Sequence, residues 1–334
     1  MILAGDIGGT KTVLALLDKQ ADGSLICRQE QTFASGEFQS FEQVLDLFLN
    51  EGIAIDSACF GVAGPVIDQR CQTTNLPWML DGEQLKIRLG TDHVKLLNDL
   101  EAMAVGMLHL QEQDFVELNP KAVTQVGNIA IIAAGTGLGE AILHWDGKDY
   151  TPIATEGGHC DFAPQNSQQD RLLAYLRRLY PGHVSCERIL SGPGFSHLYD
   201  FLAESGFAQP CPAIPDTDVG SGLDRNALIS RLGIDGEDTL CREAVRLFVE
   251  VYGAETGNLA LKALATGGVF IGGGIGPKIR PMLESGEFIQ AFTAKGRFQS
   301  LLSKISVKLA INPRTPLLGA MHYFDSQIQV TESK

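Results

Sequence analysis

The stretch GDIGGTKT, residues 5–12, joins two short apolar segments, residues 2–6 and 13–18, through a glycine-rich turn. A nucleotide P-loop has the spacing Gly, four residues, Gly-Lys-Ser/Thr, and it opens a helix whose first N–H groups hold the phosphates. Thr10 stands where a P-loop requires its second glycine, and the segment that follows has the apolar character of a strand. The stretch therefore predicts a strand–turn–strand hairpin and not a P-loop.

A second stretch, NIAIIAAGTGLGEAILHW at residues 128–145, repeats this arrangement of apolar strand, glycine turn and second apolar strand. A repeat of this kind indicates two related lobes. Backbone N–H groups in such turns can form anion-binding nests, so the two turns together suggest phosphate binding from opposite sides. Glycine-rich hairpins are also common in ordinary β structure, and each turn taken alone is more typical of a structural role.

The rest of the chain alternates strand-like and helix-like segments, which predicts an α/β protein. Residues 57–66 and 267–276 resemble buried strands that end in glycine turns, and residues 93–108 resemble a strand that runs into a helix. Apolar residues at helical spacing predict helices over residues 168–180 and 242–264.

The charge of the chain limits the classes of ligand. There are 26 Lys and Arg against 40 Asp and Glu, a formal net charge of −14. Duplex nucleic acids and anionic membranes require a basic face, so this balance argues against both as partners. A phosphate ligand would be held by backbone N–H groups and a metal ion rather than by a cationic patch. At 334 residues the chain is longer than a single compact core favours, and we expect two domains.

The seven cysteines are scattered and include no C-x-x-C pair, which is typical of free thiols in a reducing compartment. No basic leader precedes the first apolar segment at Ile2, and no apolar run reaches the length of about 20 residues that a membrane span needs. We therefore expect a soluble, cytoplasmic protein without a disulfide framework.

Asn98 and Asp99 stand where an apolar strand gives way to a helix. Asn is a favoured N-cap, and Asp suits the positive end of the helix dipole, so the pair has a sufficient structural explanation. The carboxyl ends of strands in α/β folds also face the ligand crevice, where a carboxylate can accept a proton. An Asp in this position would be a weak base, which suffices for phosphoryl transfer because its transition state is loose.

Another polar group of residues lies in the middle of the chain. TEGGHCDF at 155–162 places Glu156 and His159 around two glycines, and Glu187 follows in SCERILSGPG at 185–194. Together with the Asn-Asp pair they supply the several donors and acceptors that a neutral polyol requires. Taken singly, each is more typical of a solvated polar residue.

Six motifs, in their order along the chain, resemble those of bacterial glucokinases in the sugar-kinase/actin-like superfamily: GDIGGTKT, LNDLEAMAVG, AAGTGLGEA, EGGHCDF, SCERILSGPG and GGVFIGGGI. The resemblance extends from about residue 2 to about residue 323, where NPRTPLLGAMHYF resembles the closing helix of the family. EGGHCDFAP and SCERILSGPG carry the likeness to glucokinases rather than to the superfamily at large. TTNLPWML at 73–80 is equally similar to the related ROK sugar kinases.

The resemblance implies an α/β fold of the two-lobed actin-like, ribonuclease H-like sugar-kinase type, with a cleft between a small α/β domain and a larger α+β domain. The small domain would comprise residues 1–109 and 312–334, and the large domain residues 110–311. It further implies ATP-dependent phosphorylation of D-glucose to glucose 6-phosphate, Mg²⁺ carried with ATP, and a homodimer. ROK kinases carry a cysteine-rich zinc loop after the GGH segment, whereas CDFAPQNSQQD offers one thiol here, so we expect no zinc.

The matched motifs also imply roles for individual residues. Asp99 would be the catalytic base that accepts the proton of the glucose 6-hydroxyl. The residues that would hold the sugar are Asn98, Asp99, Glu156, His159, Glu187 and Asn75. Asp6 would position Mg²⁺–ATP through water. The residues of the two phosphate turns and of the adenosine segment would be Gly8, Gly9 and Thr10, then Gly135, Thr136 and Gly137, then Gly272, Gly273 and Gly274.

Other functions remain open on the sequence. A kinase for mannose, fructose or an N-acetylhexosamine would share the fold and mechanism and differ in relative kcat/KM across sugars. A sugar-sensing regulator would need an added helix-turn-helix, yet the first strand begins at Ile2 and the chain is acidic. An actin-like filament or chaperone ATPase would not require the implied set of sugar-holding residues. The phosphoryl donor, ATP or polyphosphate, is open as well.

Overall fold

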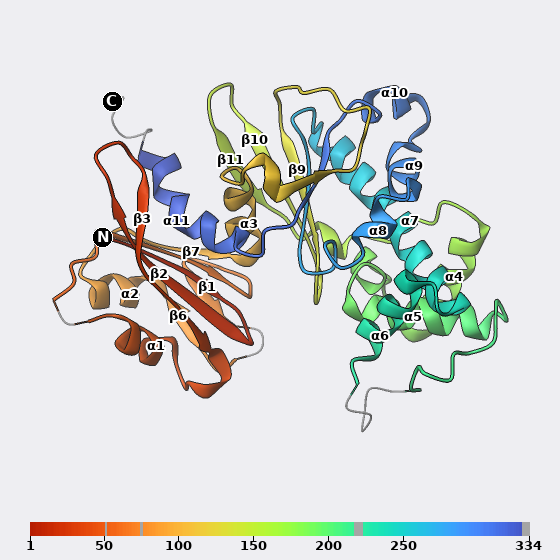
Figure 1. The fold of residues 1–334 in the computed structure, drawn as a ribbon, viewed down its shortest axis with the longest axis horizontal. Helices are drawn as coiled ribbons and strands as arrows, with labels where there is room; N and C mark the ends of the chain where they lie inside the picture. Colours follow the sequence, from red (N-terminus) through yellow and green to blue (C-terminus); the bar gives the residue numbers. More distant parts are fainter. Residues whose placement is uncertain (51, 74–75, 217–222, 329–334) are drawn as a thin grey trace. The chain divides into compact units, whose positions relative to one another are not determined.

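The computed structural model of the chain describes residues 1–50, 52–73, 76–216 and 223–328. Its internal contacts divide it into two units: unit 1 is Met1–Asp114 with Asn312–Lys334, and unit 2 is Phe115–Ile311. Figure 1 shows the blue C-terminal helix α11 (Thr315–Ile328) against the red and orange elements of the N-terminal segment, so the two ends of the chain build one unit.

Unit 1 is built on a five-stranded sheet and a small two-stranded ribbon. Its strands are β1 (Ile2–Ile7), β2 (Lys11–Lys19), β3 (Leu25–Ala34), β4 (Ser57–Val62), β5 (Arg70–Gln72), β6 (Met79–Asp81) and β7 (Val94–Asn98). Its helices are α1 (Phe41–Phe48), α2 (Gly82–Leu89), α3 (Asp99–Met107) and α11, with 3₁₀ helices η1 (Ser35–Glu37) and η2 (Glu112–Asp114).

The turn at residues 8–10 joins β1 to β2 as an antiparallel hairpin, which confirms the predicted strand–turn–strand arrangement. On its other side β1 pairs in parallel with β4, and β4 pairs in parallel with β7, so the sheet has the order β3-β2-β1-β4-β7. Because β1, β4 and β7 run in the same direction, their carboxyl ends lie at one edge of the sheet. The 8–10 turn and the junction between β7 and α3 share that edge.

Alternate residues of β1 pack into two separate apolar cores, one on each face of the sheet. Leu3 and Ile7 pack with residues of α1 and α2, whereas Ile2 and Ala4 pack with residues of α3 and α11. By this alternation Asp6 belongs to the face that α3 and α11 cover. The side chain of Asp6 is therefore on the same side of the sheet as the helix that follows β7.

Unit 2 is built on a six-stranded sheet. Its strands are β8 (Phe115–Glu117), β9 (Ile129–Ala134), β10 (Leu138–Trp145), β11 (Tyr150–Ala154), β12 (Gly268–Gly272) and β13 (Val307–Ala310). Its helices are α4 (Ser167–Leu179), α5 (Gly192–Glu204), α6 (Arg225–Asp235), α7 (Thr239–Ala263), α8 (Arg280–Leu283), α9 (Glu287–Thr293) and α10 (Gln299–Leu302), with 3₁₀ helices η3 (Gly157–His159), η4 (Cys186–Arg188) and η5 (Gly296–Phe298).

The sheet of unit 2 repeats the strand order of unit 1. Its order is β11-β10-β9-β12-β13-β8, in which β9 and β10 form an antiparallel hairpin and β9 pairs in parallel with β12. The first five strands therefore follow the same sequence of connections as β3-β2-β1-β4-β7, and β8 adds a sixth strand at the edge. This confirms the second predicted hairpin and the internal repeat.

The core of unit 2 is centred on α7, for which the sequence predicts a long helix over 242–264. Val245, Phe248, Val249 and Tyr252 of α7 are fully buried, as their helical spacing predicts. They share one apolar core with alternate residues of β9 and with α5, α6 and α9. The carboxylate of Asp238 caps the first turn of α7 by accepting a hydrogen bond from a backbone N–H.

All seven cysteines are free thiols, as predicted. In the part of the chain that the structure describes, no helix combines the length and the apolar character that crossing a bilayer requires.

Helices α3 and α11 cross where Gly106 faces the backbone of α11. An ideal Cβ on Gly106 would lie 1.9 Å from the carbonyl oxygen of Thr315. We expect Gly106→Ala to force the helices apart and to lower the free energy of unfolding by about 1–3 kcal/mol, because overpacking strains both backbones. Urea unfolding measures the loss. Gly36→Ala, where a Cβ meets nothing within 4 Å, is the matched control. A Gly106→Ala protein that unfolds at the wild-type midpoint would contradict the close crossing.

Candidate functional site

The first glycine turn is closed by a hydrogen bond from Gly8 N to Lys11 O of 2.9 Å. Ser35, which is fully buried, braces it: the Ser35 N–H donates to Thr10 O at 3.1 Å, and Ser35 Oγ donates to Gly8 O at 2.8 Å. Because both bonds engage carbonyl oxygens of the turn, they disfavour peptide orientations that would place a carbonyl against a phosphate. Ser35 could not be identified from the sequence, because it follows β3 and nothing near it in the sequence marks a contact with the turn.

Asp6 lies near the end of β1, just before this turn. Burial raises the pKa of Asp6 from 3.8 to about 6, against the opposing effect of Lys11 and with a further contribution from the charge of Asp99. The carboxyl groups of Asp6 and Asp99 are thus close enough to interact, although one belongs to β1 and the other to α3. Two acidic groups at one place favour a cation or a proton near them.

β7 ends at Asn98 and α3 begins at Asp99, which confirms the predicted strand-to-helix junction. Asn98 Oδ1 accepts from Glu101 N at 2.6 Å, and Glu101 Oε2 accepts from Asn98 N at 3.0 Å, a complete capping box. Asp99 is exposed, and its Oδ1 accepts from Leu100 N at 2.9 Å. The cap fixes the direction in which the chain leaves the strand, and it leaves the Asp99 carboxylate accessible to solvent at a defined place.

In unit 2 the second and third glycine segments meet at the carboxyl ends of β9 and β12, which are neighbouring parallel strands. The second turn, residues 135–137, is joined to the start of α5, because Gly192 N donates to Gly135 O at 2.9 Å. In the third segment, Gly273 has a φ of 81°, and a Cβ there would lie 2.3 Å from Ala134 O, so only glycine fits. The backbone of the third segment therefore packs directly on the strand that leads into the second turn.

Glu156, His159 and Glu187 are carried by two neighbouring turns of unit 2. Glu156 directly precedes η3, His159 is its last residue, and Glu187 lies within η4. The chain that leaves η3 pairs with the chain that enters η4, with Cys186 N donating to Cys160 O at 2.9 Å. Glu156 and His159 are exposed and Glu187 is half-buried, which is the pattern of side chains available to a ligand.

Glu187 connects these turns to the second glycine turn. Its Oε2 accepts from Leu138 N at 3.0 Å, directly after that turn, and an ideal Cβ on Gly137 would lie 2.5 Å from the same oxygen. Ser191 Oγ donates to Glu187 O at 2.7 Å. The carboxylate is therefore held in one direction by the backbone beside the turn, and its other oxygen can accept a hydrogen bond from a ligand.

The structure thus groups the candidate residues within each unit. In unit 1 the candidate residues lie at the carboxyl-terminal ends of β1 and β7 and in the segments that directly follow them. They are Asp6, Gly8, Gly9, Thr10, Asn98 and Asp99. In unit 2 the corresponding region gathers Gly135, Thr136, Gly137, Gly272, Gly273, Gly274, Glu156, His159 and Glu187. Asn75 lies outside the described residues.

The carboxyl groups of Asp6 and Asp99 fit a hydrated cation better than a cation that they would bind directly. Over residues 1–50, 52–73, 76–216 and 223–328, no three His, Cys, Asp or Glu side chains are grouped so as to hold a metal ion. Mg²⁺ keeps several waters and binds to one or two carboxylates together with phosphates. The pair formed by Asp6 and Asp99 fits that arrangement.

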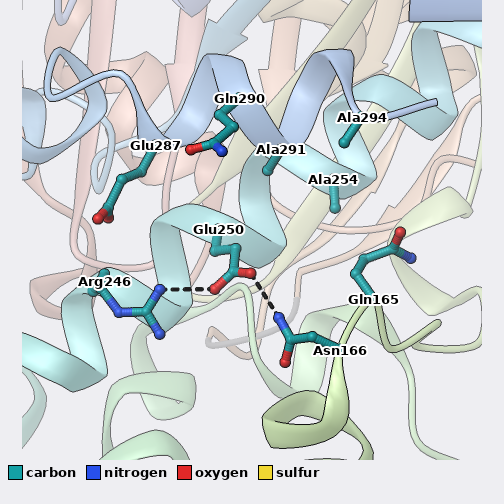
Figure 2. Close-up of a pocket in the computed structure, with 9 residues that line it drawn as sticks. All are labelled: Gln165, Asn166, Arg246, Glu250, Ala254, Glu287, Gln290, Ala291 and Ala294. Carbon is teal, nitrogen blue, oxygen red and sulfur yellow. Dashed lines mark hydrogen bonds and ion pairs between the residues drawn. The ribbon is translucent and has the colours of Figure 1, made fainter. Parts of the chain in front are cut away.

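A polar hollow of about 380 Å³ in unit 2 does not include the candidate residues. Figure 2 shows it between α7, α9 and the segment before α4, with Arg246, Glu250 and Asn166 among its lining side chains. The guanidinium of Arg246 binds Glu250 at 2.9 Å and Glu243 at 2.7 Å. Because these carboxylates already neutralise the cation of the hollow, its chemistry does not favour the phosphates of a nucleotide.

Comparison with known proteins gives consistent matches along nearly the whole chain. A family model described as Glucokinase matches residues 3–327. A glucokinase of Synechocystis sp. is 40% identical, covering 95% of this chain and 96% of the relative. A glucokinase of Tolumonas auensis is 35% identical, covering 98% of both chains.

Solved structures agree. A glucokinase crystal structure from an Antarctic psychrotroph matches with a TM-score of 0.84 and 31% identity over 97% of this chain and 98% of that chain. A ROK-family glucokinase of Streptomyces griseus, in complex with glucose and AMPPNP, matches with a TM-score of 0.60 and 20% identity over 96% of this chain and 97% of that chain, a likeness of fold alone. The predicted actin-like sugar-kinase fold is confirmed, and the chain belongs to the glucokinase family.

Proposed function

We propose that the protein catalyses the ATP-dependent phosphorylation of D-glucose to glucose 6-phosphate, with Asp99 as the general base. The observation that carries this proposal is the family match over residues 3–327, with relatives named glucokinase at 35% and 40% identity. The complex of the Streptomyces griseus neighbour with glucose and AMPPNP supports a sugar and a nucleotide as the two ligands.

Asp99 is suited to orient and deprotonate a hydroxyl. It is exposed, it stands at the positive end of α3, and one of its oxygens is fixed by the Leu100 N–H. The capping box occupies one lone pair of the Asn98 side-chain oxygen, and we assign sugar binding to the amide nitrogen of Asn98, a hydrogen-bond donor that the cap does not use. The two adjacent side chains then offer one donor and one acceptor to the same sugar.

In the proposed reaction the 6-hydroxyl oxygen of glucose attacks the γ-phosphorus of ATP while its proton passes to the Asp99 carboxylate. The new O–P bond forms as the bond from the γ-phosphorus to the β–γ bridging oxygen breaks, and ADP leaves with that electron pair. Because this transition state is loose, positioning contributes more than the strength of the base.

The glycine turns supply the electrostatic part. Backbone N–H groups of Gly8–Thr10 and Gly135–Gly137 would face the phosphates, and the segment at 272–274 would contact the adenosine. Such preorganised donors stabilise charge that develops during transfer and need no reorganisation. Mg²⁺ bound with ATP would neutralise charge on its terminal phosphates, and Asp6 would hold it through water.

The sugar-binding side would be formed by Glu156, His159 and Glu187. Each is a hydrogen-bonding side chain on a turn whose backbone is fixed by the contacts described above. Carboxylates accept from sugar hydroxyls, so the two glutamates require hydroxyls at the positions they face and select against sugars that lack them. A homodimer and a cytoplasmic location complete the proposal as family-level expectations.

A coupled assay for ADP release with MgATP tests the reaction and its base together. We expect turnover to require glucose, and Asp99→Asn to lower kcat by about 10²–10⁴-fold, because the amide cannot accept the proton. Asp92→Asn, another exposed acid of unit 1 just before β7, is the matched control and keeps wild-type turnover.

Three results of the same assay would change or refute the proposal. They come from runs with other hexoses, with polyphosphate and without sugar. Turnover only with another hexose would change the substrate. Turnover with polyphosphate instead of ATP would change the donor. ADP release that is equal with and without sugar would refute the proposed kinase.

Asp6→Asn separates function from stability. The pKa of Asp6 is about 6 in the folded protein against 3.8 ordinarily, so the folded state holds its proton more tightly than the unfolded chain. Between these values stability falls as pH rises, because the unfolded chain releases the proton first. Asn cannot ionise. At pH 7.5 we expect Asp6→Asn to raise the free energy of unfolding by about 1–3 kcal/mol while MgATP turnover falls at least about tenfold.

Thermal unfolding from pH 3 to pH 8 follows this difference, which should shrink toward zero near the lower limit, where Asp6 is mostly protonated in both the folded and the unfolded state. Asp92→Asn again serves as the exposed control. Equal stability of Asp6→Asn and wild type at pH 7.5 would contradict the burial cost assigned to Asp6.

A further inference from the structure

Glu140 is a buried acid of unit 2 to which the proposed reaction gives no role. It lies on β10 and is 1% exposed. Among the residues that the structure describes, none forms a hydrogen bond with its Oε1. A buried carboxyl oxygen without a partner is costly, and in a native structure it calls for a functional or structural reason.

The carboxyl group of Glu140 lies directly beneath the turn that carries Glu156 and His159. An ideal Cβ on Gly157 would lie 2.1 Å from Glu140 Oε2, so the glycine leaves the space that the carboxyl fills. Thr155 Oγ1 donates to Glu140 O at 2.7 Å, and Gly157 N donates to Thr155 Oγ1 at 3.1 Å. The main chain and the side chain of Glu140 thus both support η3 from the strand below it.

A second buried acid, Glu255 of α7, lies near Glu140 and is 4% exposed. Its carboxylate accepts from Asn258 Nδ2 at 2.8 Å and forms an ion pair with Lys262 at 3.3 Å. Cys186 Sγ also donates to it at 3.5 Å, and Cys186 directly precedes the candidate sugar residue of η4. The two acids therefore contact both turns that carry the candidate sugar-binding side chains.

The charges around Glu140 are unbalanced. The titratable groups that face it are Glu255, Lys262 and Tyr252 from α7 and Cys186 from η4, whereas η3 presents glycine. Burial, with the charge of Glu255 added, raises the pKa of Glu140 from 4.5 to about 7, and Lys262 opposes the shift. The ammonium of Lys262 is already bound to Glu255, and the nearby ammonium of Lys295 also interacts with Glu255. An ionised Glu140 would therefore add a second carboxylate without a cation bound to it.

We propose that Glu140 is a positioning residue for glucose binding, whose neutral carboxyl group supports the turn bearing Glu156 and His159 and whose ionisation loosens that turn. The inference rests on the proposed function, since it concerns the same sugar site. It assigns Glu140 no contact with substrate and no part in phosphoryl transfer. Its effect is expected in the affinity for glucose and in the pH dependence of that affinity.

Glu140→Gln tests the inference, because glutamine keeps the shape of the protonated acid and cannot ionise. Glucose KM and kcat are measured between pH 6 and pH 8, and glucose binding without ATP is measured by calorimetry over the same range. We expect the ratio of wild-type to variant KM to rise from near 1 at pH 6 to about 3–10 at pH 8, with the kcat ratio unchanged. Glu117→Gln, on strand β8 at the far edge of the same sheet, is the control and follows wild type.

Lys262→Met is a second, independent test, and it remains available if Glu140→Gln fails to fold. Lys262 favours the ionised form of Glu140, so its removal should move the midpoint of the KM–pH profile to higher pH. A merely structural role for these residues would change stability without moving this midpoint. Thermal unfolding of each variant separates the two effects.

The contrary outcomes are distinct. If wild type phosphorylates glucose and Glu140→Gln has the same KM as wild type at every pH, the inference is wrong and the proposed function stands. A kcat ratio that changes with pH while KM does not would also overturn it. If wild type neither binds nor phosphorylates glucose, the proposed function fails and this inference fails with it.

Discussion

Parallel pairing between one central strand and its neighbour determines where chemistry can occur in each unit. β1 pairs with β4, and β9 pairs with β12, in the same direction, so the turn after each first strand lies beside the end of its parallel partner. Strand ends leave backbone N–H groups that the ladder does not use, and the glycine turns there can present them to an anion. In unit 1 the third parallel strand, β7, brings Asn98 and Asp99 to the same edge. A slip of β1 by one residue would turn the Asp6 side chain to the opposite face of the sheet.

The half-buried Asp6 and the buried Glu140 place opposite demands on the protein. Asp6 has a pKa of about 6, and as the proposed support of a hydrated Mg²⁺ it must ionise despite its burial. Glu140 has a pKa of about 7 and, in the inferred role, works while it is neutral. Near neutral pH the first acid is therefore mostly ionised and the second is divided between its two forms. In the proposed function the protein thereby contains one group that gains function as pH rises and another that loses it, and a pH optimum between the two pKa values follows from their difference.

Several features follow from local sequence. Both hairpins, the junction at Asn98 and Asp99, and the helix through Val245 and Tyr252 are marked by spacing or by turn chemistry within a few residues. Ser35, Glu140 and Glu255 are different, because their importance arises from contacts between segments far apart in the chain. Ser35 follows β3 yet braces the turn after β1, and Glu140 on β10 is influenced by Glu255 on α7. A polar residue in an apolar pattern is the one signal the sequence offers for such positions, and Glu140, inside the apolar run of β10, does show it.

The structural and the functional explanations of Asn98 are compatible. Its side-chain oxygen and backbone N–H complete the capping box with Glu101, and this fixes the main chain at the point where Asp99 leaves the strand. A general base that works through orientation needs such a fixed starting point, since an error of about 1 Å in placement removes much of the benefit of proximity. The cap also engages the oxygen of the Asn98 amide and leaves its nitrogen as a donor, which complements the acceptor of Asp99. The residue that best explains the start of the helix is thus also the residue that makes a catalytic Asp99 possible.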